Sequence, residues 1–284
     1  MEKLNFFATK KIRLIALLSN NITSYKYSAI EKALRKKDVC VNGQRVKENV
    51  WLNEFDEVSI YLNEKDKLNL FDVFYEDQNI IVFNKQKGIE VCNGEFNIQS
   101  EYQKTFNKTI YPIHRLDRNT FGLVVFAKTE SVEKELVESF KNHNVTKCYY
   151  ALVYGQPKQN AKTLKSYLIK DEKTSTVKIF DTKQSGASYI ETKYQVLKNF
   201  QLSTLLSVEI TAGKTHQIRA HLAYFNMPIV GDEKYGDTKT NKIFKTKTQM
   251  LQAYMIKFNL PKSSNLYYLN KITLNLPCEI KENL

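Results

Sequence analysis

Hydrophobic and polar residues follow two distinct periods along the chain, and each period predicts one kind of element. Residues 123–127 (LVVFA) form an unbroken apolar run with β-branched side chains, which is typical of a strand buried on both faces. Directly after it, Val132, Leu136, Val137 and Phe140 recur at helical spacing. The pattern therefore predicts a buried strand and then a helix over residues 131–140 that packs on it.

The amino-terminal part of the chain has the pattern of a small domain. Val39 and Val41 alternate before an Asn42-Gly43 pair and Val46 follows it, which is a strong hairpin signal. We expect helices over residues 12–18 and 28–35 and a strand over residues 57–62. The hydrophilic stretch 64–67 has neither Gly nor Pro and predicts a brief linker. The expected domains are therefore residues 1–66 and 67–284.

The larger domain reads as many short strands with few helices. Strand patterns cover residues 80–83, 147–155, 197–212, 250–260 and 269–276, and residues 214–225 predict a helix with one apolar face. Residues 100–110 are polar and carry no clear element. We therefore expect an α+β fold on a largely antiparallel, mixed sheet. Residues 228–249 are turn-rich and basic (Lys239, Lys242, Lys245, Lys247), which predicts either an RNA-contacting loop or a plain surface loop.

The charge of the chain favours a polyanionic partner. Its 43 basic and 30 acidic residues give a net charge of +13 over 284 residues. Lysine and arginine gain affinity for nucleic acid by releasing condensed counterions from phosphates. No apolar run reaches transmembrane length, and the first residues are too weakly apolar for a signal peptide. We expect a cytoplasmic, monomeric protein that binds RNA and not a membrane.

Neither the cysteines nor the histidines indicate a metal site. The four cysteines lie far apart and form no C-x-x-C pair, so we expect free thiols in a reducing compartment. His216 and His221 are five residues apart, which does not superpose them on one helix face.

The strongest chemical candidate lies in residues 111–128, YPIHRLDRNTFGLVVFAK. Asp117 stands between Arg115 and Arg118 on a loop that enters the predicted buried strand. A carboxylate on such a loop is held by a rigid element, as a precise reaction requires. An Asp between two Arg residues is also a common surface ion pair. This stretch alone leaves both interpretations open.

Three motifs read together resolve that choice through a resemblance. HRLDRNTFGLVVFAK, KCYYALVYG and GKTHQIRAHLAYFNMPIVGDEKYG resemble, in order and spacing, the motifs of RluA-type pseudouridine synthases. The match spans most of residues 70–277. It implies isomerisation of uridine to pseudouridine within ribosomal RNA, above all that of the large subunit, or transfer RNA, without cofactor or metal. The glycosidic bond must break and re-form at another ring atom, so the base has to flip out of its helix. An aromatic ring that stacks on the flipped base and a side chain that fills its place would offset the lost stacking.

The resemblance also implies roles for individual residues. Asp117 matches the essential aspartate, which either attacks the ribose anomeric carbon or takes the neighbouring ribose proton. Arg219 matches the arginine that pairs with that aspartate, and Tyr149 the tyrosine that stacks on the uracil. Arg115 matches the arginine that fills the space of the flipped base. His114, Lys214 and Ile218 lie in the same motifs, and we expect them to contact the substrate RNA.

Residues 12–62 resemble the small RNA-binding domain of ribosomal protein S-four. Arg35, Lys36 and Lys37, at the end of its second predicted helix, are the expected RNA contacts. Ile15 and Phe55 depart from that pattern, where Asp and Gly are usual.

Four residues depart from the synthase motifs without removing a proposed catalytic group: Gln86, Phe121, Asn226 and Gln252. Two other classes stay open at this point. One is a non-catalytic RNA-binding or chaperone protein, and the other is a metal-dependent nuclease, which the lack of clustered carboxylates disfavours. The sequence does not identify the target uridine.

Overall fold

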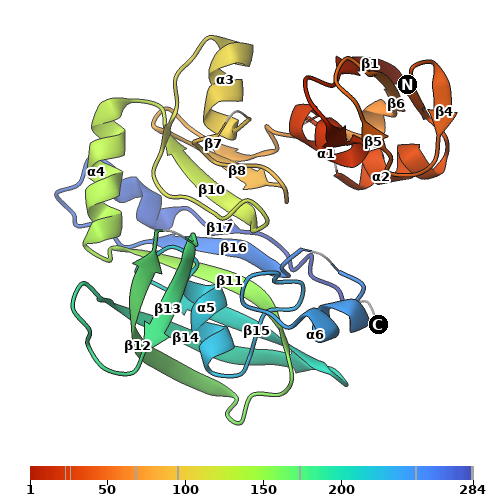
Figure 1. Ribbon diagram of the computed structural model, residues 1–284. Helices are drawn as coiled ribbons and strands as arrows, with labels where there is room; N and C mark the ends of the chain where they lie inside the picture. The colour runs from red at the N-terminus through yellow and green to blue at the C-terminus, as the bar shows by residue number, and fades with distance from the viewer. Residues whose placement is uncertain are drawn as a thin grey trace. The chain divides into compact units, whose positions relative to one another are not determined.

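The computed structural model divides the chain into two compact units, Met1–Leu70 and Phe71–Leu284 (Figure 1). It describes residues 1–284 except Thr23, Lys26, Leu68, Glu95, Lys173, Lys247, Asn283 and Leu284. Lys247 of the predicted basic stretch therefore lies outside the described residues. The expected linker at residues 64–67 contains a 3-10 turn, η1 (Glu64–Asp66), within the first unit. Asp66 pairs with Lys32, and Lys67 with Glu2.

The first unit packs two helices on a four-stranded sheet with the strand order β1-β6-β3-β4. The predicted hairpin is confirmed, since Asn42 (φ 49°) and Gly43 (φ 79°) form its turn. The first helix begins at Leu14, two residues later than expected, because Ile12 and Arg13 pair with Trp51 and Leu52. The elements are β1 (Glu2–Phe7), β2 (Ile12–Arg13), α1 (Leu14–Asn21), α2 (Tyr27–Arg35), β3 (Val39–Val41), β4 (Gln44–Val46), β5 (Trp51–Leu52) and β6 (Glu57–Leu62).

The second unit is built on one large sheet, and the predicted α+β class is confirmed. Its strands run in the order β13-β12-β14-β15-β11-β16-β10-β8-β7, with β17 beside β16 and β9 beside β10. Neighbours are antiparallel except for β10 and β16, which pair in parallel. The strands are β7 (Val73–Glu76), β8 (Ile80–Lys85), β9 (Tyr111–Pro112), β10 (Phe121–Ala127), β11 (Val145–Tyr154), β12 (Ala161–Asp171), β13 (Thr176–Phe180), β14 (Ser188–Asn199), β15 (Ser203–Ile210), β16 (Leu251–Phe258) and β17 (Leu274–Asn275).

The helices of this unit confirm one prediction and correct others. Helix α4 (Glu130–Lys141) packs Val132 and Leu136 on strand β10, as expected (Figure 1). The unpredicted helix α3 (Ile98–Phe106) buries only Ile98 and Tyr102, so its periodicity is weak. The other helices are α5 (Gln217–Tyr224), α6 (Thr238–Ile243) within the basic stretch, and η2 (Tyr267–Lys271). In the described part of the chain, no helix is long and apolar enough to cross a membrane.

Three further expectations were wrong in detail. The single strand predicted over residues 197–212 is the end of β14, a turn, and β15. Most of the strand predicted at residues 269–276 is the turn η2 and its exit, and only Leu274–Asn275 pair. Helix α5 does not bury a single apolar face, because all residues from Gln217 to Leu222 are buried. Its polar side chains must therefore find partners inside the protein.

Gly122 allows strand β10, which follows the Asp117 loop, to approach strand β16 closely. It has a φ of 108°, and a Cβ at this position would overlap the Ala253 backbone, 2.8 Å from its carbonyl carbon and 2.9 Å from its nitrogen. Gly122 and Ala253 are paired in the parallel register of β10 and β16. Both the backbone conformation and the space therefore require glycine.

We expect Gly122→Ala to lower the free energy of unfolding by more than about 3 kcal/mol, because backbone strain and steric overlap add. Gly186→Ala is the matched control, since Gly186 has a φ of 75° but open space around it. Its expected cost is about 1 to 2 kcal/mol from backbone conformation alone. Urea denaturation measures both, and equal losses would contradict the packing role of Gly122.

Candidate active site

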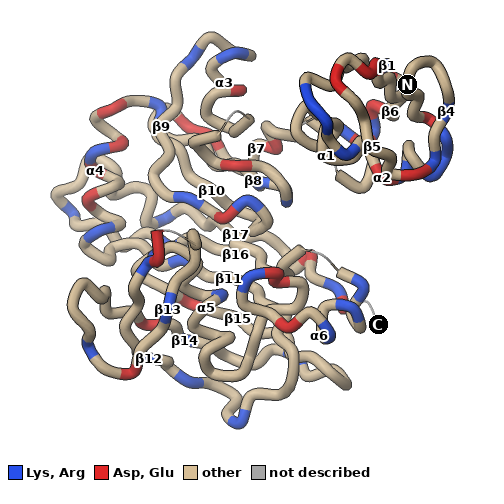
Figure 2. The backbone as a smooth tube through the Cα atoms, in the orientation of Figure 1, with Lys and Arg blue, Asp and Glu red and all other residues tan. Residues whose placement is uncertain are grey.

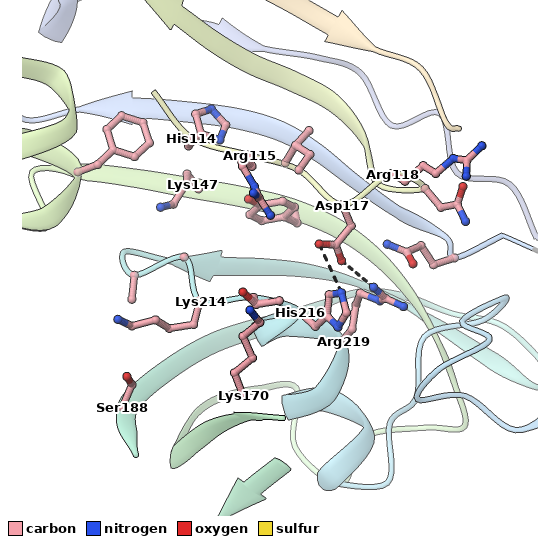
Figure 3. A pocket seen from close by; sticks show the side chains of 18 of the residues that line it. His114, Arg115, Asp117, Arg118, Lys147, Lys170, Ser188, Lys214, His216 and Arg219 are labelled. Carbon is pink, nitrogen blue, oxygen red and sulfur yellow. Dashed lines mark hydrogen bonds and ion pairs between the residues drawn. The ribbon is translucent and has the colours of Figure 1, made fainter. Parts of the chain in front are cut away.

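A cleft of about 1150 Å³ in the second unit brings the predicted motifs together. Asp117 comes from the loop between β9 and β10, Tyr149 from strand β11, and Arg219 from helix α5. Lys170, Ser188 and Lys214 line the cleft opposite the loop that carries Asp117 (Figure 3). Three segments that are far apart in the sequence therefore contribute to one site.

Arg219 bridges two carboxylates. Its Nη1 donates to Asp117 Oδ2 at 2.7 Å, while its Nε and Nη2 donate to the two oxygens of Asp232 at 2.7 and 2.8 Å. The Asp232 side chain is completely buried and that of Arg219 is 7% exposed, whereas the Asp117 side chain is 28% exposed. The two-point bond to Asp232 fixes the plane of the guanidinium. Asp117 is therefore oriented by the Arg219 guanidinium, which Asp232 in turn holds in place.

The surroundings of Asp232 stabilise its charged form. Burial alone would raise the pKa of Asp232, but the hydrogen bonds and charge of Arg219 and the backbone amides of Lys234 and Tyr235 outweigh it. The pKa of this carboxyl therefore lies below its usual value. The same pairing outweighs the burial of Arg219 and raises its pKa, so the guanidinium stays charged.

His216 faces the other oxygen of Asp117. Its Nε2 lies 3.9 Å from Asp117 Oδ1 (Figure 3). Its Nδ1 is 2.8 Å from the hydroxyl of Tyr235. The Tyr235 hydroxyl accepts a hydrogen bond from the amide of Val177, so its own proton is available for Nδ1. Burial lowers the pKa of His216 despite the attraction of Asp117, which favours a neutral imidazole near pH 7. In the part of the chain that the structure describes, Asp117 Oδ1 accepts no hydrogen bond.

Tyr149 lies against the cleft and Tyr150 does not. Tyr149 is 6% exposed and lines the cleft, while Tyr150 stacks on Tyr254 with ring centroids 3.8 Å apart. Their opposite directions agree with the alternation expected on a strand. Burial, with the charge of Asp117, raises the pKa of Tyr149, so its phenol stays neutral. Ile218, which is buried, lies with Tyr149 around a small cavity of about 60 Å³.

A buried lysine anchors the loop that carries Asp117. Lys85 Nζ donates to the carbonyl oxygens of Gln86 (3.0 Å), Ile89 (2.8 Å) and Arg118 (2.9 Å). The Arg118 side chain in turn donates to the carbonyl of Gly88 at 3.1 Å. Burial lowers the pKa of Lys85 to about 7. Lys85 and Arg118 thus tie the loop to the turn after strand β8.

The remaining predicted RNA-contacting residues occupy three settings. Arg115 and Lys214 are exposed at the cleft. His114 also lines the cleft, but its Nε2 accepts from the Val125 amide at 3.2 Å and its ring stacks on Phe140. Burial lowers the pKa of His114 to about 3, so it is neutral at physiological pH. Arg35, Lys36 and Lys37 are exposed in the first unit, outside this cleft.

Sequence reasoning missed Asp232, His216, Tyr235 and Lys85 as parts of the site. Asp232 and Tyr235 lie in the basic stretch that was expected to be a solvent-exposed or RNA-contacting loop. The available signal was the Gly231 that directly precedes Asp232, since Gly231 has a φ of 80° and a Cβ there would overlap the Thr248 backbone. Among the described residues, no group of three or more His, Cys, Asp or Glu side chains could hold a metal ion. The four cysteines are free thiols.

Comparison with known proteins agrees with this arrangement. The family model described as RNA pseudouridylate synthase matches residues 79–224. The chain belongs to this family. It is 32% identical to the ribosomal large subunit pseudouridine synthase C of Pasteurella multocida, over 86% of this chain and 81% of that protein. It is 28% identical to the uncharacterized RNA pseudouridine synthase YlyB of Bacillus subtilis, over 89% and 88%.

Solved structures show the same fold. Human RNA Pseudouridylate Synthase Domain Containing 1 superposes with a TM-score of 0.61 at 20% identity, covering 72% of this chain and 82% of that one. Human RNA Pseudouridylate Synthase Domain Containing 4 gives a TM-score of 0.55 at 22% identity, covering 70% and 90%. The predicted membership in the RluA-type pseudouridine synthases is confirmed, and the chain is an RNA-modifying isomerase.

In this pseudouridine synthase, we expect Asp232→Asn to lower the free energy of unfolding by about 3 to 5 kcal/mol, because Arg219 would lose its buried counter-charge. Pseudouridine formation should fall by about 100-fold as Asp117 loses its fixed partner. Asp66→Asn is the control: its pair with Lys32 spans 3.6 Å at the surface and contributes less than about 1 kcal/mol. Equal effects of the two substitutions would contradict the bridging role of Arg219.

The pH dependence of stability has a definite sign. Because the pKa of Asp232 is lowered in the folded protein, its contribution is present above the unfolded carboxyl value of about 4 and is lost as the pH falls through the folded value. The wild-type protein should therefore lose more stability than Asp232→Asn when urea denaturation is repeated from pH 6 down to about pH 3. Parallel losses in both proteins would contradict this assignment.

Proposed function

We propose that this enzyme converts uridine to pseudouridine in large-subunit ribosomal RNA, with Asp117 as its catalytic carboxylate. The observation that carries the proposal is the bond from Arg219 to Asp117 Oδ2, which leaves Oδ1 facing a large cleft. Several relatives, including those of Pasteurella multocida and Vibrio parahaemolyticus, are named ribosomal large subunit pseudouridine synthase C. We further propose that it acts in the cytoplasm as a monomer, without metal or cofactor.

The reaction is an isomerisation in which bonds and protons balance. The bond between ribose C1′ and uracil N1 breaks, the base turns, and a bond from C1′ to C5 forms. C5 loses its proton and N1 gains one, so no oxidant or reductant is required. Asp117 either attacks C1′ or takes the neighbouring ribose proton. Both roles need a carboxylate oxygen that is free of strong partners, which describes Oδ1.

The cleft has groups suited to a nucleotide that has left its helix. Tyr149 offers a neutral ring on which a uracil can stack, with Ile218 packed nearby. Arg115 is exposed at the cleft and can fill the space that the base vacates. His114 and Lys214 complete the proposed RNA contacts on the walls of the cleft. His216, neutral and facing Asp117, can hold or pass a proton at Nε2.

The first unit adds a second proposed RNA contact. Arg35, Lys36 and Lys37 are exposed at the end of helix α2, and Lys and Arg residues outnumber acidic ones over the chain (Figure 2). Phosphate contacts of this kind supply affinity without reading sequence. We therefore assign additional RNA affinity to the first unit, beside the RNA contacts and the chemistry of the second.

We expect Asp117→Asn to abolish pseudouridine formation in large-subunit ribosomal RNA while leaving RNA affinity within about twofold, because the substitution keeps the shape of the side chain. Asp181→Asn, which changes an exposed carboxylate outside the cleft, is the control and should keep full activity. The products are measured by nucleoside mass spectrometry after incubation with ribosomal and transfer RNA. Full activity of Asp117→Asn would sink the catalytic assignment. RNA binding without any pseudouridine in the wild-type reaction would favour a non-catalytic RNA-binding protein.

Replacement of Arg35, Lys36 and Lys37 together by Ala should weaken RNA binding and flatten its salt dependence. Each lost phosphate contact reduces the slope of log K against log salt concentration by about 0.7 to 0.9. The control variant replaces Lys165 and Lys193, which are surface lysines already paired with carboxylates. An unchanged slope in the triple variant would remove the first unit from the proposed RNA-binding surface.

A further inference from the structure

Lys147 is a buried cation in the cleft that no proposed catalytic step uses. It lies on strand β11, is 5% exposed and lines the cleft beside His114 (Figure 3). Its ammonium lies 5.0 Å from the centre of the Phe140 ring. Within the described part of the chain, no carboxylate lies within the 4.0 Å of an ion pair with Lys147 Nζ. A buried charge without a counter-charge is unfavourable in the free protein.

The neighbouring loop leaves room for this ammonium. A Cβ at Gly213 would lie 3.1 Å from Lys147 Nζ, which is tighter than an ordinary contact. Gly213 does not have the positive φ that would itself require glycine. The absence of a side chain at Gly213 therefore leaves space beside the Lys147 ammonium.

The local chemistry keeps Lys147 charged but unsatisfied. Burial lowers its pKa to about 8, so most molecules still carry the charge at neutral pH. Of the acidic residues that line the cleft, Glu90, Asp117 and Glu233, none forms an ion pair with Lys147 in the described part of the chain. His114 has a pKa lowered to about 3 and supplies no charge. An anion from outside the protein is the group that this site lacks.

The position of Lys147 identifies which part of a substrate would supply the anion. Lys147 and Tyr149 are two residues apart on one strand and share a face, about 7 Å apart along it. This span is comparable to the distance between a nucleobase and the phosphodiester of its own nucleotide. If Tyr149 receives the flipped uracil, the backbone phosphate of the same nucleotide falls near Lys147.

We propose that Lys147 binds the phosphodiester of the flipped nucleotide, so that the substrate RNA supplies the counter-charge that the protein does not provide. The proposal rests on the proposed function, because it uses the same cleft and the same flipped base. It gives Lys147 a substrate-binding role and no part in bond breaking. In the free enzyme this largely buried side chain has no counter-charge among the described residues, and RNA binding supplies one.

The test measures RNA affinity against salt concentration without turnover, in the Asp117→Asn protein, using large-subunit ribosomal RNA. Lys147→Met should weaken binding and reduce the slope of log K against log salt concentration by about 0.7 to 0.9, the value for one phosphate. Lys257→Met is the matched control, since it removes an exposed lysine of strand β16 outside the cleft, and should leave the slope unchanged. Lys147→Arg should restore the slope because it keeps the charge.

Thermal unfolding of the same proteins separates this role from a structural one. Lys147→Met should raise the Tm of the RNA-free protein because it removes an unpaired buried charge, and Lys147→Gln is tested beside it in case the thioether packs poorly. An unchanged salt slope in both variants, or a lowered Tm in both, would overturn the proposal. A reduced slope together with no pseudouridine formation by the wild-type enzyme would keep the phosphate site and reject the proposed reaction.

Discussion

The site depends on one buried guanidinium that joins two carboxylates of different burial. Arg219 donates two hydrogen bonds to Asp232, which is fully buried, and one to Asp117, which reaches the cleft. A buried ion pair contributes little to stability by itself, because desolvation offsets the attraction. Its value here is geometric, since the two-point bond to Asp232 leaves Arg219 one orientation. Asp117 is thereby held in place without giving up its second oxygen.

Elsewhere in the cleft, some groups are likewise held by the protein itself, while another has no partner within the protein. Lys85 donates to three backbone carbonyls and fixes the loop of Asp117, and Gly122 lets the following strand β10 approach strand β16. Lys147, by contrast, is buried without a counter-charge within reach in the described structure. The first two residues serve the folded enzyme alone. Lys147 gains a counter-charge only when an anion binds, which links RNA binding to the stability of the protein.

The sequence predicted the parts of this protein whose signal is local or carried by a motif. The strand of β10, the helix α4 and the Asn42-Gly43 hairpin follow from periodicity and turn chemistry. Asp232 did not follow, because an acidic residue in a basic, turn-rich stretch reads as solvated until its buried partner is known. Strand β12 was not predicted for a related reason: its exposed lysines mask the alternation of its few buried residues. Contacts between residues far apart in the sequence decide whether such positions are buried, and a short window of sequence does not contain these contacts.

The most direct test of the account maps pseudouridine in the ribosomal RNA of cells that lack this gene and carry either the wild-type protein or Asp117→Asn. We predict that specific uridines of the large-subunit RNA lose the modification in the deletion, regain it with the wild-type protein, and stay unmodified with Asp117→Asn at equal protein levels. Restoration by Asp117→Asn would contradict the central claim that the carboxylate held by Arg219 performs the isomerisation.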